Sequence, residues 1–368
     1  MDKVAFITHT TDKGGASESF LTVMKTLSDK ITYADHLLIY PETNKNDAYA
    51  ALKDTMPHFQ WRLPFSWIFR GAEPGIHRKV YRMVMEGFAM FAFLFKYNKI
   101  LAREQVRTIY LNSIVLWCLL PVLPQHLNLV IHIRETVDDS LEGKLAVWTI
   151  HHFADTIITI DANVAKPFAD LHWKVKIVPN PIDMTRARGL RERKDMLRSR
   201  IEVPKENFVV AFIAPVGQMK GHPFLLKALE KIKTDNITFV LAGLPDHNNI
   251  LVEKLKAYQN VIYLGEMGDV SNIYALSDLV IRCEDYLPLG RTVWEGMYAG
   301  LPVLLPIRPQ DDKSVIIDYL GRYIYTYTAT NVIDFIKWID IIRHYNFVPY
   351  PESSNIAEST NGFVSALE

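Results

Sequence analysis

Cysteine is the residue that this sequence uses least, and neither sign of charge is in excess. Cys118 and Cys283 are the only cysteines in 368 residues, and they stand far apart, without a CxxC or metal-ligand spacing. Two isolated cysteines exclude a disulfide scaffold and indicate reduced core thiols in a cytoplasmic protein. Lys and Arg together number 41, as do Asp and Glu, so no net charge indicates a nucleic acid or an acidic partner.

Long apolar runs are also missing. The longest are 87–95 and 114–123, which are about half of the roughly 20 residues needed to span a bilayer. The chain opens with Met1-Asp2-Lys3 directly before a short strand, without the pattern of a signal peptide. We expect a cytoplasmic protein that is soluble or peripheral at the inner face of the membrane.

The sequence does contain a repeated alternation of short β-branched runs and helical segments. With 49% hydrophobic and 22% charged residues, its 368 residues are enough for two domains. The alternation is typical of α/β domains built on parallel sheets. Strands are expected at 4–8, 108–111, 129–132 and 157–160, and then at 208–213, 237–243, 261–265, 279–281 and 303–305.

Residues 279–306 carry the clearest functional pattern. A strand at 279–281 is followed by a loop, a helix that begins near Arg291, and a second strand at 303–305. The first N–H groups of such a helix are unpaired and carry a partial positive charge that suits a phosphate; they belong to Gly290, Arg291 and Thr292. Glu295, one turn later on the same face, can accept hydrogen bonds from hydroxyls beside that phosphate. The pattern predicts a sugar-nucleotide site.

The stretch 287–304, LPLGRTVWEGMYAGLPVL, resembles the donor-binding segment of the family 4 retaining glycosyltransferases of the GT-B fold. In that family, Glu-Pro-Phe-Gly is followed by a second Glu at the eighth position after the first. The first Glu contacts the transferred sugar and the second contacts the nucleotide ribose. On this chain Glu295 takes the place of the second Glu, whereas Leu287 stands at the first.

The resemblance implies two Rossmann-like parallel-sheet domains with a cleft between them and a C-terminal helix crossing back. The acceptor-side domain would cover 1–180 and the nucleotide-sugar-binding domain 181–335, and a crossover helix and tail over 336–368 would pack toward the first domain. Asn180 lies in a stretch similar to the family's interdomain crossing Val-x-Asn-Gly-Ile-Asp, with Pro181 in place of the glycine. The tail from Pro349 is polar, and we expect it to fray.

Further donor-site residues follow from the resemblance. Lys220-Gly221 matches a Lys-Gly pair that opens a helix, and a lysine there would neutralise the donor diphosphate. Pro215 stands where the family has an Arg, so one cation is missing unless Arg291 supplies it. A shifted loop would let Glu284 or Asp285 replace the absent first Glu. The donor site is also expected to include Gly14, Gly15, Glu266, Leu289, Gly290 and Thr292.

A dense polar cluster, 132–139, follows the strand at 129–132, and open α/β sheets place ligand groups at such strand ends. His132 is the candidate for a His that contacts the donor sugar in similar transferases, and the alternative is a hydrogen-bonded core histidine. Arg134 and Glu135 would line the acceptor side or form an ion pair that braces it. Asn180 is assigned to the same acceptor or cleft group.

Residues 61–107 combine nine Lys and Arg residues with only three Glu residues and many aromatics. One interpretation is a surface that contacts an anionic membrane, with aromatics at headgroup level. The other is a long helix over 77–104 whose apolar face packs in the core of the first domain. Both interpretations hold together if 61–82 is the exposed part of this stretch.

The implied activity is transfer of a hexose-type sugar from a nucleotide diphosphate sugar to a glycan or lipid-linked acceptor hydroxyl, with retention, in cell-surface polysaccharide synthesis. His132, Lys220 and Glu295 are the candidate catalytic residues. No cofactor or metal is expected, since no Asp-x-Asp stands at a strand end. Leu287 and Pro215 keep open a noncatalytic GT-B binding module that partners an active transferase. A sugar-nucleotide epimerase on the same fold is a further alternative.

Overall fold

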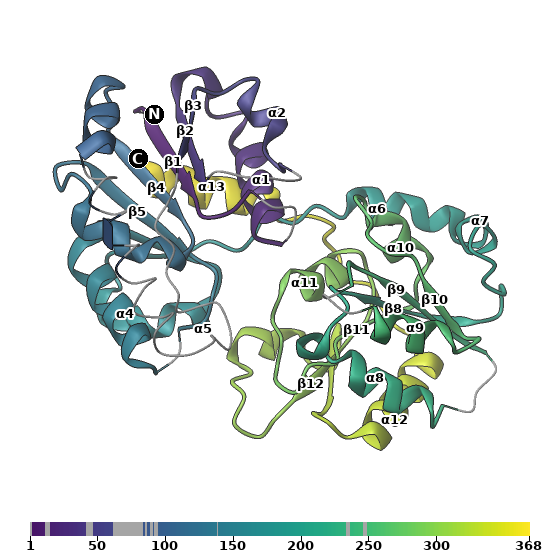
Figure 1. The fold of residues 1–368 in the computed structure, drawn as a ribbon. Coiled ribbons are helices and arrows are strands. Elements are labelled where there is room, and N and C mark those ends of the chain that lie inside the picture. The colour runs from purple at the N-terminus through teal and green to yellow at the C-terminus, as the bar shows by residue number, and fades with distance from the viewer. Residues whose placement is uncertain are drawn as a thin grey trace. The chain divides into compact units, whose positions relative to one another are not determined.

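A computed structural model describes residues 2–11, 15–41, 47–61, 84, 87–88, 91, 95–137, 139–232, 236–245 and 249–368. The chain divides into two compact units, each with its own parallel sheet (Figure 1). The first unit comprises Met1–Pro181 together with Ile356–Glu368, and the second comprises Ile182–Asn355. The chain therefore leaves the first unit after Pro181 and returns to it at Ile356.

The first unit is built on a seven-stranded sheet in the order β3-β2-β1-β4-β5-β6-β7, and every neighbouring pair is parallel. β-branched and aromatic residues fill these strands, as expected for a sheet that is covered on both faces. The strands are β1 (Val4–Thr8), β2 (Leu37–Pro41), β3 (His58–Trp61), β4 (Thr108–Asn112), β5 (Asn128–Ile133), β6 (Thr156–Thr159) and β7 (Val175–Ile177).

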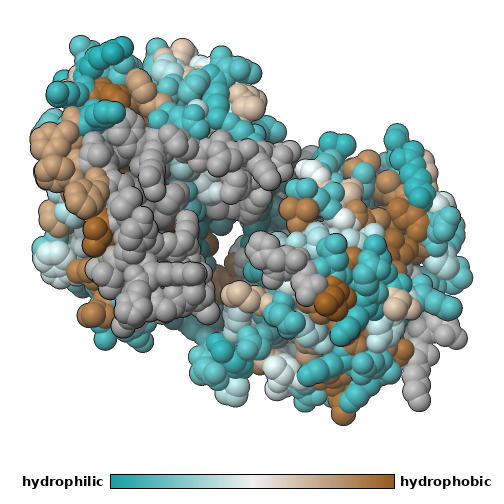
Figure 2. Space-filling view, in the orientation of Figure 1, coloured by the Kyte–Doolittle hydropathy of each residue, from teal (hydrophilic) through white to brown (hydrophobic). Residues whose placement is uncertain are grey.

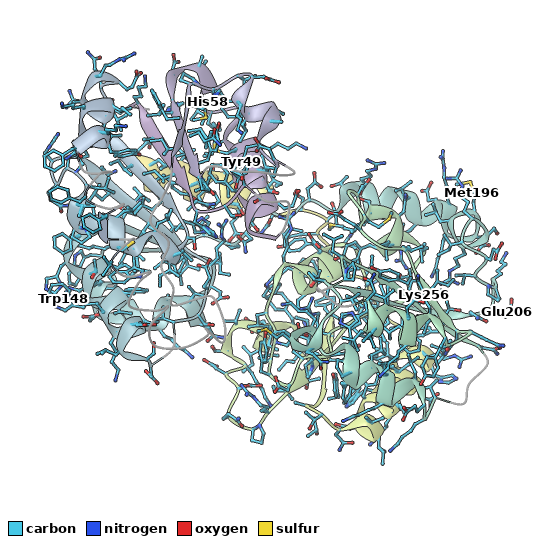
Figure 3. All side chains as sticks on the ribbon, viewed as in Figure 1. Tyr49, His58, Trp148, Met196, Glu206 and Lys256 are labelled. Carbon is cyan, nitrogen blue, oxygen red and sulfur yellow. The ribbon has the colours of Figure 1, made fainter. Side chains whose placement is uncertain are left out.

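Helices cover both faces of this first sheet. One face packs with α1 (Gly15–Leu27) and α13 (Ile356–Leu367), around side chains such as Phe6 and Tyr110. The other face packs with α4 (Leu141–Phe153) and the 3-10 helix η3 (Ile114–Val122). Shorter elements are η1 (Tyr33–Asp35), α2 (Ala50–Lys53), α5 (Ala162–Ala165) and η4 (Lys166–Leu171). Figure 3 shows Tyr49 inside this unit and Trp148 at its outer edge.

The second unit is built on a six-stranded parallel sheet in the order β10-β9-β8-β11-β12-β13. Its strands are β8 (Phe208–Ile213), β9 (Ile237–Ala242), β10 (Val261–Tyr263), β11 (Leu279–Ile281), β12 (Val303–Ile307) and β13 (Ile324–Thr328). In both sheets the early strands add on one side of the unit's first strand, and the later strands add on its other side. The switch point therefore lies between β1 and β4 in the first sheet and between β8 and β11 in the second. Ligands of open α/β sheets bind at the carboxyl ends of the strands at such a switch point.

Two layers of helices enclose the second sheet. One layer contains α6 (Thr185–Leu190), α7 (Lys194–Ser199), α10 (Ser271–Leu276) and α11 (Arg291–Tyr298). The other contains α8 (His222–Leu229), α9 (Ile250–Lys256) and α12 (Val332–His344). The 3-10 helices η5 (Arg191–Arg193), η6 (Gln218–Lys220) and η7 (Ser314–Tyr319) complete this unit. Hydrophilic residues prevail on the face of the molecule shown in Figure 2, with hydrophobic residues scattered among them.

The C-terminal helices correct two expectations. Residues 336–355 stay with the second unit, where α12 packs on α8 and β13, so they do not form part of a crossover helix. The tail does not fray, because α13 places Phe363, Ala366 and Leu367 in the core of the first unit. The spacing of these apolar residues suits one helical face. The sequence analysis missed this pattern because polar residues surround it.

No helix among the described residues is long and apolar enough to cross a membrane. The predicted membrane-facing stretch 61–107 lies largely outside the described ranges. Of its described residues, Tyr97 and Leu101 are buried in the core, whereas Phe88, Phe91 and Phe95 are exposed. The interpretation as a helix buried in the core therefore does not hold for these three phenylalanines.

We expect α13 to stabilise the first unit strongly. Phe363 is fully buried and its ring centroid lies 5.3 Å from that of His132 in a T-shaped contact. Replacing a buried Phe with Ala typically costs about 3–5 kcal/mol, so Phe363→Ala should lower the free energy of unfolding of the first unit by about that amount in denaturant titrations. Asn361→Ala, at an exposed position of the same helix, is the control. Equal stability of the two variants would contradict this role of α13.

Candidate functional site

The switch point of the second sheet collects the chain segments that follow β8 and β11. β8 and β11 are neighbours, with Leu279 paired to Val210 and Val280 to Ala211. The segment after β8 leads through η6 to α8, and the segment after β11 leads to α11. Residues that follow the two strands therefore meet at one edge of the sheet, although about 70 residues separate them in the sequence.

Lys220 and Gly221 form the turn that leads into α8. Gly221 has φ +80°, and a Cβ on it would lie 1.8 Å from the carbonyl oxygen of Cys283, so only glycine allows this approach of the two segments. Lys220 Nζ lies 4.0 Å from a carboxylate oxygen of Glu284. Burial and the charge of Arg282 lower the pKa of Lys220, and Glu284 raises it. A lysine expected from the sequence to hold a diphosphate thus lies at the switch point.

Glu284 does not serve as a substitute for the missing sugar-binding Glu. Its side chain is fully buried and is bound by the guanidinium of Arg282 through Nε and Nη2. It also accepts a hydrogen bond from the backbone N–H of Cys283 at 3.2 Å. Asp285 is exposed. The expectation that Glu284 replaces the first Glu is therefore wrong for this structure, because its carboxylate is already paired with a cation.

The start of α11 presents the expected phosphate-binding backbone. Gly290 is the N-cap, and a Cβ built on it would meet nothing within 4 Å. Arg291 Nε donates to Glu295 at 2.5 Å, one turn along the same helix. The hydroxyl of Thr292 accepts a hydrogen bond from Arg282 Nη1 at 2.7 Å.

Glu295 lies on the buried side of α11 with its carboxylate already oriented. One oxygen accepts from Arg291, and the other accepts from the hydroxyl of Tyr274 at 2.7 Å. A carboxylate held by two donors is fixed in place before a ligand arrives and keeps further lone pairs for hydroxyl groups. Leu287 and Leu289 pack against the apolar core beside it. Among the described residues, no group of three or more His, Cys, Asp and Glu side chains is placed to hold a metal ion.

The structure places His132 in the core of the first unit. The side chain is fully buried, and its Nδ1 lies 2.5 Å from the hydroxyl of Tyr110. It shares its sheet face with Val130, and Phe363 of α13 covers the ring. Burial and the charge of Arg134 lower the pKa of His132 well below its ordinary value. The assignment of His132 as a donor-contacting residue is wrong for this structure, because the alternation of the strand turns it under α13.

A polar cluster stands instead at the switch point of the first sheet, after β1, β4 and β5. Arg134 Nη2 donates to the side-chain oxygen of Asn112 at 2.8 Å. Glu135 accepts hydrogen bonds from the Ser113 hydroxyl at 2.8 Å and from the Arg134 N–H at 3.1 Å. Arg134 and Glu135 are thus held by neighbouring strand ends and not by a direct pair of their side chains.

His9 belongs to the same cluster and was missed in the sequence. Its Nδ1 lies 3.2 Å from the carbonyl oxygen of Asn112. Because a carbonyl can only accept, Nδ1 carries the hydrogen in this bond and Nε2 is the ring atom left to accept one. Burial lowers the pKa of His9, and Glu135 raises it. The signal was available in its position directly after β1, beside the switch to β4.

Four other expected site residues are not joined to these clusters by a contact that can be described. Gly14 lies outside the described residues, and Gly15 begins α1. Glu266 is exposed after β10, two strands away from β8. Asn180 lies at the end of the first unit, next to the crossing to the second.

Comparisons with known proteins agree with this architecture. Residues 193–338 match the family described as "Glycosyl transferases group 1". "Uncharacterized glycosyltransferase MJ1607" of Methanocaldococcus jannaschii is 30% identical over 120 residues, and the match spans 31% of each protein.

Two solved structures are similar along the whole chain. HepE of Anabaena in complex with UDP and glucose is 17% identical, with a TM-score of 0.71 over 100% of this chain and 94% of that one. WaaG, a glycosyltransferase involved in lipopolysaccharide biosynthesis, is 14% identical, with a TM-score of 0.61 over 99% of this chain and 95% of that one.

The chain therefore has the GT-B fold, and the predicted pair of parallel-sheet Rossmann-like units is confirmed. The match over residues 193–338 to the group 1 glycosyl transferases agrees with the resemblance to glycosyltransferases found in the sequence for this part of the chain.

The histidine next to the turn, His222, should make the second unit sensitive to acid. His222 is fully buried, stacks on Phe212 with ring centroids 4.4 Å apart, and accepts from the N–H of Gly217 at 3.4 Å. Burial lowers its pKa from 6.5 to about 4. Between these pH values the unfolded chain binds a proton that the folded chain does not, so stability falls as the pH falls from 6.5 toward 4, by at most about 3 kcal/mol.

His222→Asn should flatten this dependence when the free energy of unfolding is measured by denaturant titration from pH 7 to pH 4. His344→Asn, at an exposed histidine of the same unit, is the control and should leave the slope unchanged. An unchanged slope in His222→Asn would show that other groups cause the acid sensitivity.

Proposed function

We propose that this protein is a retaining glycosyltransferase that moves a sugar from a nucleotide diphosphate sugar to a hydroxyl of a glycan or lipid-linked acceptor, in the synthesis of cell-surface polysaccharide. The observation that carries the proposal is the meeting of Lys220, the start of α11 and Glu295 at the switch point of the second sheet, within the part that matches the group 1 family. The similar HepE structures contain UDP, glucose and UDP-glucose, which supports a nucleotide-sugar donor.

Each of these groups has a role in the proposed reaction. Lys220 and the backbone N–H groups at the start of α11 would hold the donor diphosphate and stabilise the charge that grows as it leaves. The carboxylate of Glu295 would accept hydrogen bonds from the ribose hydroxyls. The leaving phosphate would take the proton of the acceptor hydroxyl on the front face, so that no strong protein base is required. These residues supply the charge without a metal or a cofactor in this proposal.

The polar cluster of the first unit is proposed to hold the acceptor. The guanidinium of Arg134 offers a hydrogen-bond donor at the carboxyl end of β5. Nε2 of His9 offers a hydrogen-bond acceptor at the carboxyl end of β1. Sugars are rich in hydroxyl groups that use both kinds of partner. His9 is the histidine of this acceptor cluster, whereas the sequence analysis assigned His132 to the donor sugar.

One observation favours the alternative of a noncatalytic binding module. Leu287 stands at the position of the sugar-contacting Glu, and the nearby Glu284 is paired with Arg282. Such a module would bind the nucleotide part of the donor without cleaving the sugar bond. Nucleotide affinity without either transfer or donor hydrolysis would identify it.

The first test is binding of nucleoside diphosphates. We expect one among UDP, GDP, ADP, CDP and dTDP to raise the melting temperature of the wild-type protein, since a ligand at 100 times its dissociation constant stabilises by about 2.7 kcal/mol. Glu295→Gln replaces two acceptor oxygens with one, and should weaken that nucleotide by about 10-fold or more and reduce turnover. Glu253→Gln, at an exposed position of α9, is the control. Wild-type affinity and turnover in Glu295→Gln would refute the site.

We also propose a peripheral contact with an anionic membrane. Val84, Phe88, Phe91 and Phe95 are 52%, 69%, 62% and 61% exposed, and their spacing of four, three and four residues suits one helical face. Lys96, Lys99 and Arg103, which follow directly, are exposed too. Exposed aromatics beside cations are typical of segments that lie in a membrane interface.

Co-sedimentation with lipid vesicles tests the contact. We expect binding to vesicles that contain phosphatidylglycerol and weaker binding to pure phosphatidylcholine, because the cations need anionic headgroups. The triple change F88S, F91S, F95S should reduce binding at least about 10-fold, since each phenylalanine contributes about 1.5–3 kcal/mol when buried. The control I333S, V348S alters exposed apolar residues of the second unit and should bind as the wild type does. Equal binding of the triple variant would refute the contact.

A further inference from the structure

Arg282 is a buried arginine that directly follows β11 at the switch point of the second sheet. Its side chain is 7% exposed. Its guanidinium reaches across to β8, where Nη1 lies 3.4 Å from the carbonyl oxygen of Ile213, and to α11, where Nη1 donates to the Thr292 hydroxyl at 2.7 Å. It therefore touches both elements between which a ligand of this sheet would bind.

The charges around Arg282 do not balance. Lys220 and Arg282 are two cations that share the single carboxylate of Glu284. The lysine stands 4.0 Å from that carboxylate, and burial, followed by the charge of Arg282, lowers the pKa of Lys220. Two cations close together in a partly buried place raise the electrostatic free energy of the folded protein, and an anion that binds between them lowers it again. The cluster therefore favours a ligand that carries negative charge.

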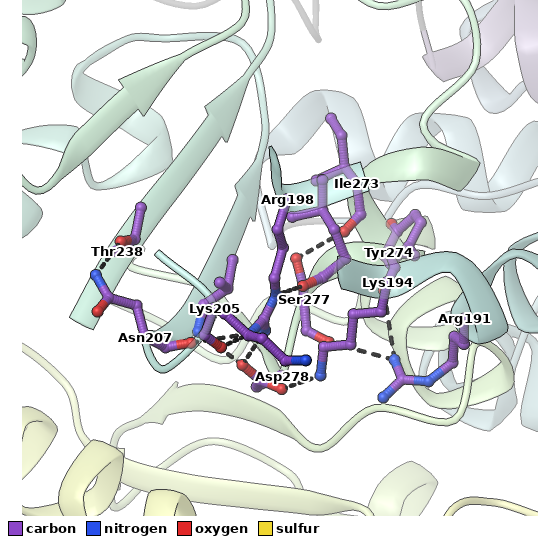
Figure 4. Close-up of polar contacts among 12 residues, drawn as sticks. Arg191, Lys194, Arg198, Lys205, Asn207, Thr238, Ile273, Tyr274, Ser277 and Asp278 are labelled. Atoms are coloured by element: carbon purple, nitrogen blue, oxygen red, sulfur yellow. Dashed lines mark hydrogen bonds and ion pairs between the residues drawn. The ribbon is translucent and has the colours of Figure 1, made fainter. Parts of the chain in front are cut away.

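A cluster of similar composition at the other end of β11 shows what a purely structural arrangement looks like (Figure 4). There Asp278 pairs with both Lys194 and Arg198 and accepts the N–H of Val209 at 2.8 Å. Arg198 also donates to three backbone carbonyls, those of Leu276, Lys205 and Asn207. Its donors are thus used by the protein itself, and both cations pair directly with the carboxylate.

The cluster at the carboxyl end differs in what its donors reach. Apart from Glu284, Arg282 contacts a hydroxyl and one distant carbonyl. Because the Thr292 oxygen accepts from Arg282, the hydrogen of that hydroxyl is directed elsewhere and is available to a ligand at the start of α11. Arg282 thus adds charge to the site and orients a neutral donor in it.

We propose that Arg282 is the second cation of the donor-diphosphate site, acting together with Lys220 and orienting Thr292. The inference rests on the proposed function for the identity of the ligand. It also accounts for the missing arginine at Pro215, because Arg282, at the end of the neighbouring strand β11, supplies the cation that is absent after β8. A guanidinium suits this role because it stays charged when buried and binds the carboxylate and the hydroxyl at once.

Calorimetric titration with UDP, UMP and inorganic diphosphate tests the proposal. Arg282→Gln should weaken UDP and diphosphate by about 10- to 100-fold, the range of a charged hydrogen bond, and UMP by much less. The ratio of the UDP and UMP affinities is the decisive quantity, because a general loss of structure lowers both. Lys194→Gln, which removes a cation from the Asp278 cluster, is the control and should leave the ratio unchanged.

A double variant separates the charge of Arg282 from its pairing with Glu284. Arg282→Gln alone leaves a buried carboxylate that would repel a diphosphate and destabilise the fold. Arg282→Gln with Glu284→Gln removes both charges, and should still bind UDP and diphosphate at least about 10-fold more weakly than the wild type does. Wild-type affinity in the double variant would mean that Arg282 only neutralises Glu284, and would overturn the proposal.

The outcomes for Arg282 and for the proposed function are distinguishable. Binding of inorganic diphosphate that depends on Arg282, without affinity for any nucleotide, would support the anion site and refute the nucleotide-sugar donor. Binding of UDP with the same UDP to UMP ratio in wild type and double variant would support the donor and refute the role of Arg282. Failure of the wild type to bind inorganic diphosphate and all five nucleoside diphosphates would refute both.

Discussion

The pairing of β8 with β11 is the contact on which the candidate donor site depends. It places the turn at Lys220 beside the strand end at Arg282, and the close approach of Gly221 to the carbonyl of Cys283 fixes their spacing. Parallel strands bring their carboxyl ends to one edge, so each βα connection contributes its first residues to the same place. The same rule assembles His9, Asn112 and Arg134 at the edge of the first sheet.

Charged groups at the candidate donor site are positioned before any ligand arrives. Tyr274 and Arg291 hold the carboxylate of Glu295, and Arg282 holds that of Glu284. Such groups do not have to reorganise when charge develops on a leaving diphosphate, which is the way in which enzymes obtain much of their electrostatic stabilisation. The departures at Leu287 and Pro215 therefore stand beside carboxylates that are already held by neighbouring side chains.

The sequence predicted the elements of the donor site more reliably than their partners. The loop and helix over 279–306, the turn at Lys220-Gly221 and the position of Glu295 on α11 follow from local patterns of glycine, proline and apolar spacing. The predictions were wrong where a side chain could point either into the core or toward the site. His132 follows the alternation of β5 and turns under α13, and Glu284 turns inward to Arg282.

By itself the sequence determined two parallel α/β units, most of their strands and the helix that begins at Arg291, because these depend on local periodicity and composition. The tertiary structure alone decided that Arg282 and Lys220 share the carboxylate of Glu284, that His9 joins Asn112 and Arg134, and that α13 returns to the first unit. Those outcomes depend on which strands become neighbours in the sheet, and residues that are distant in the sequence carry no local signal of that contact.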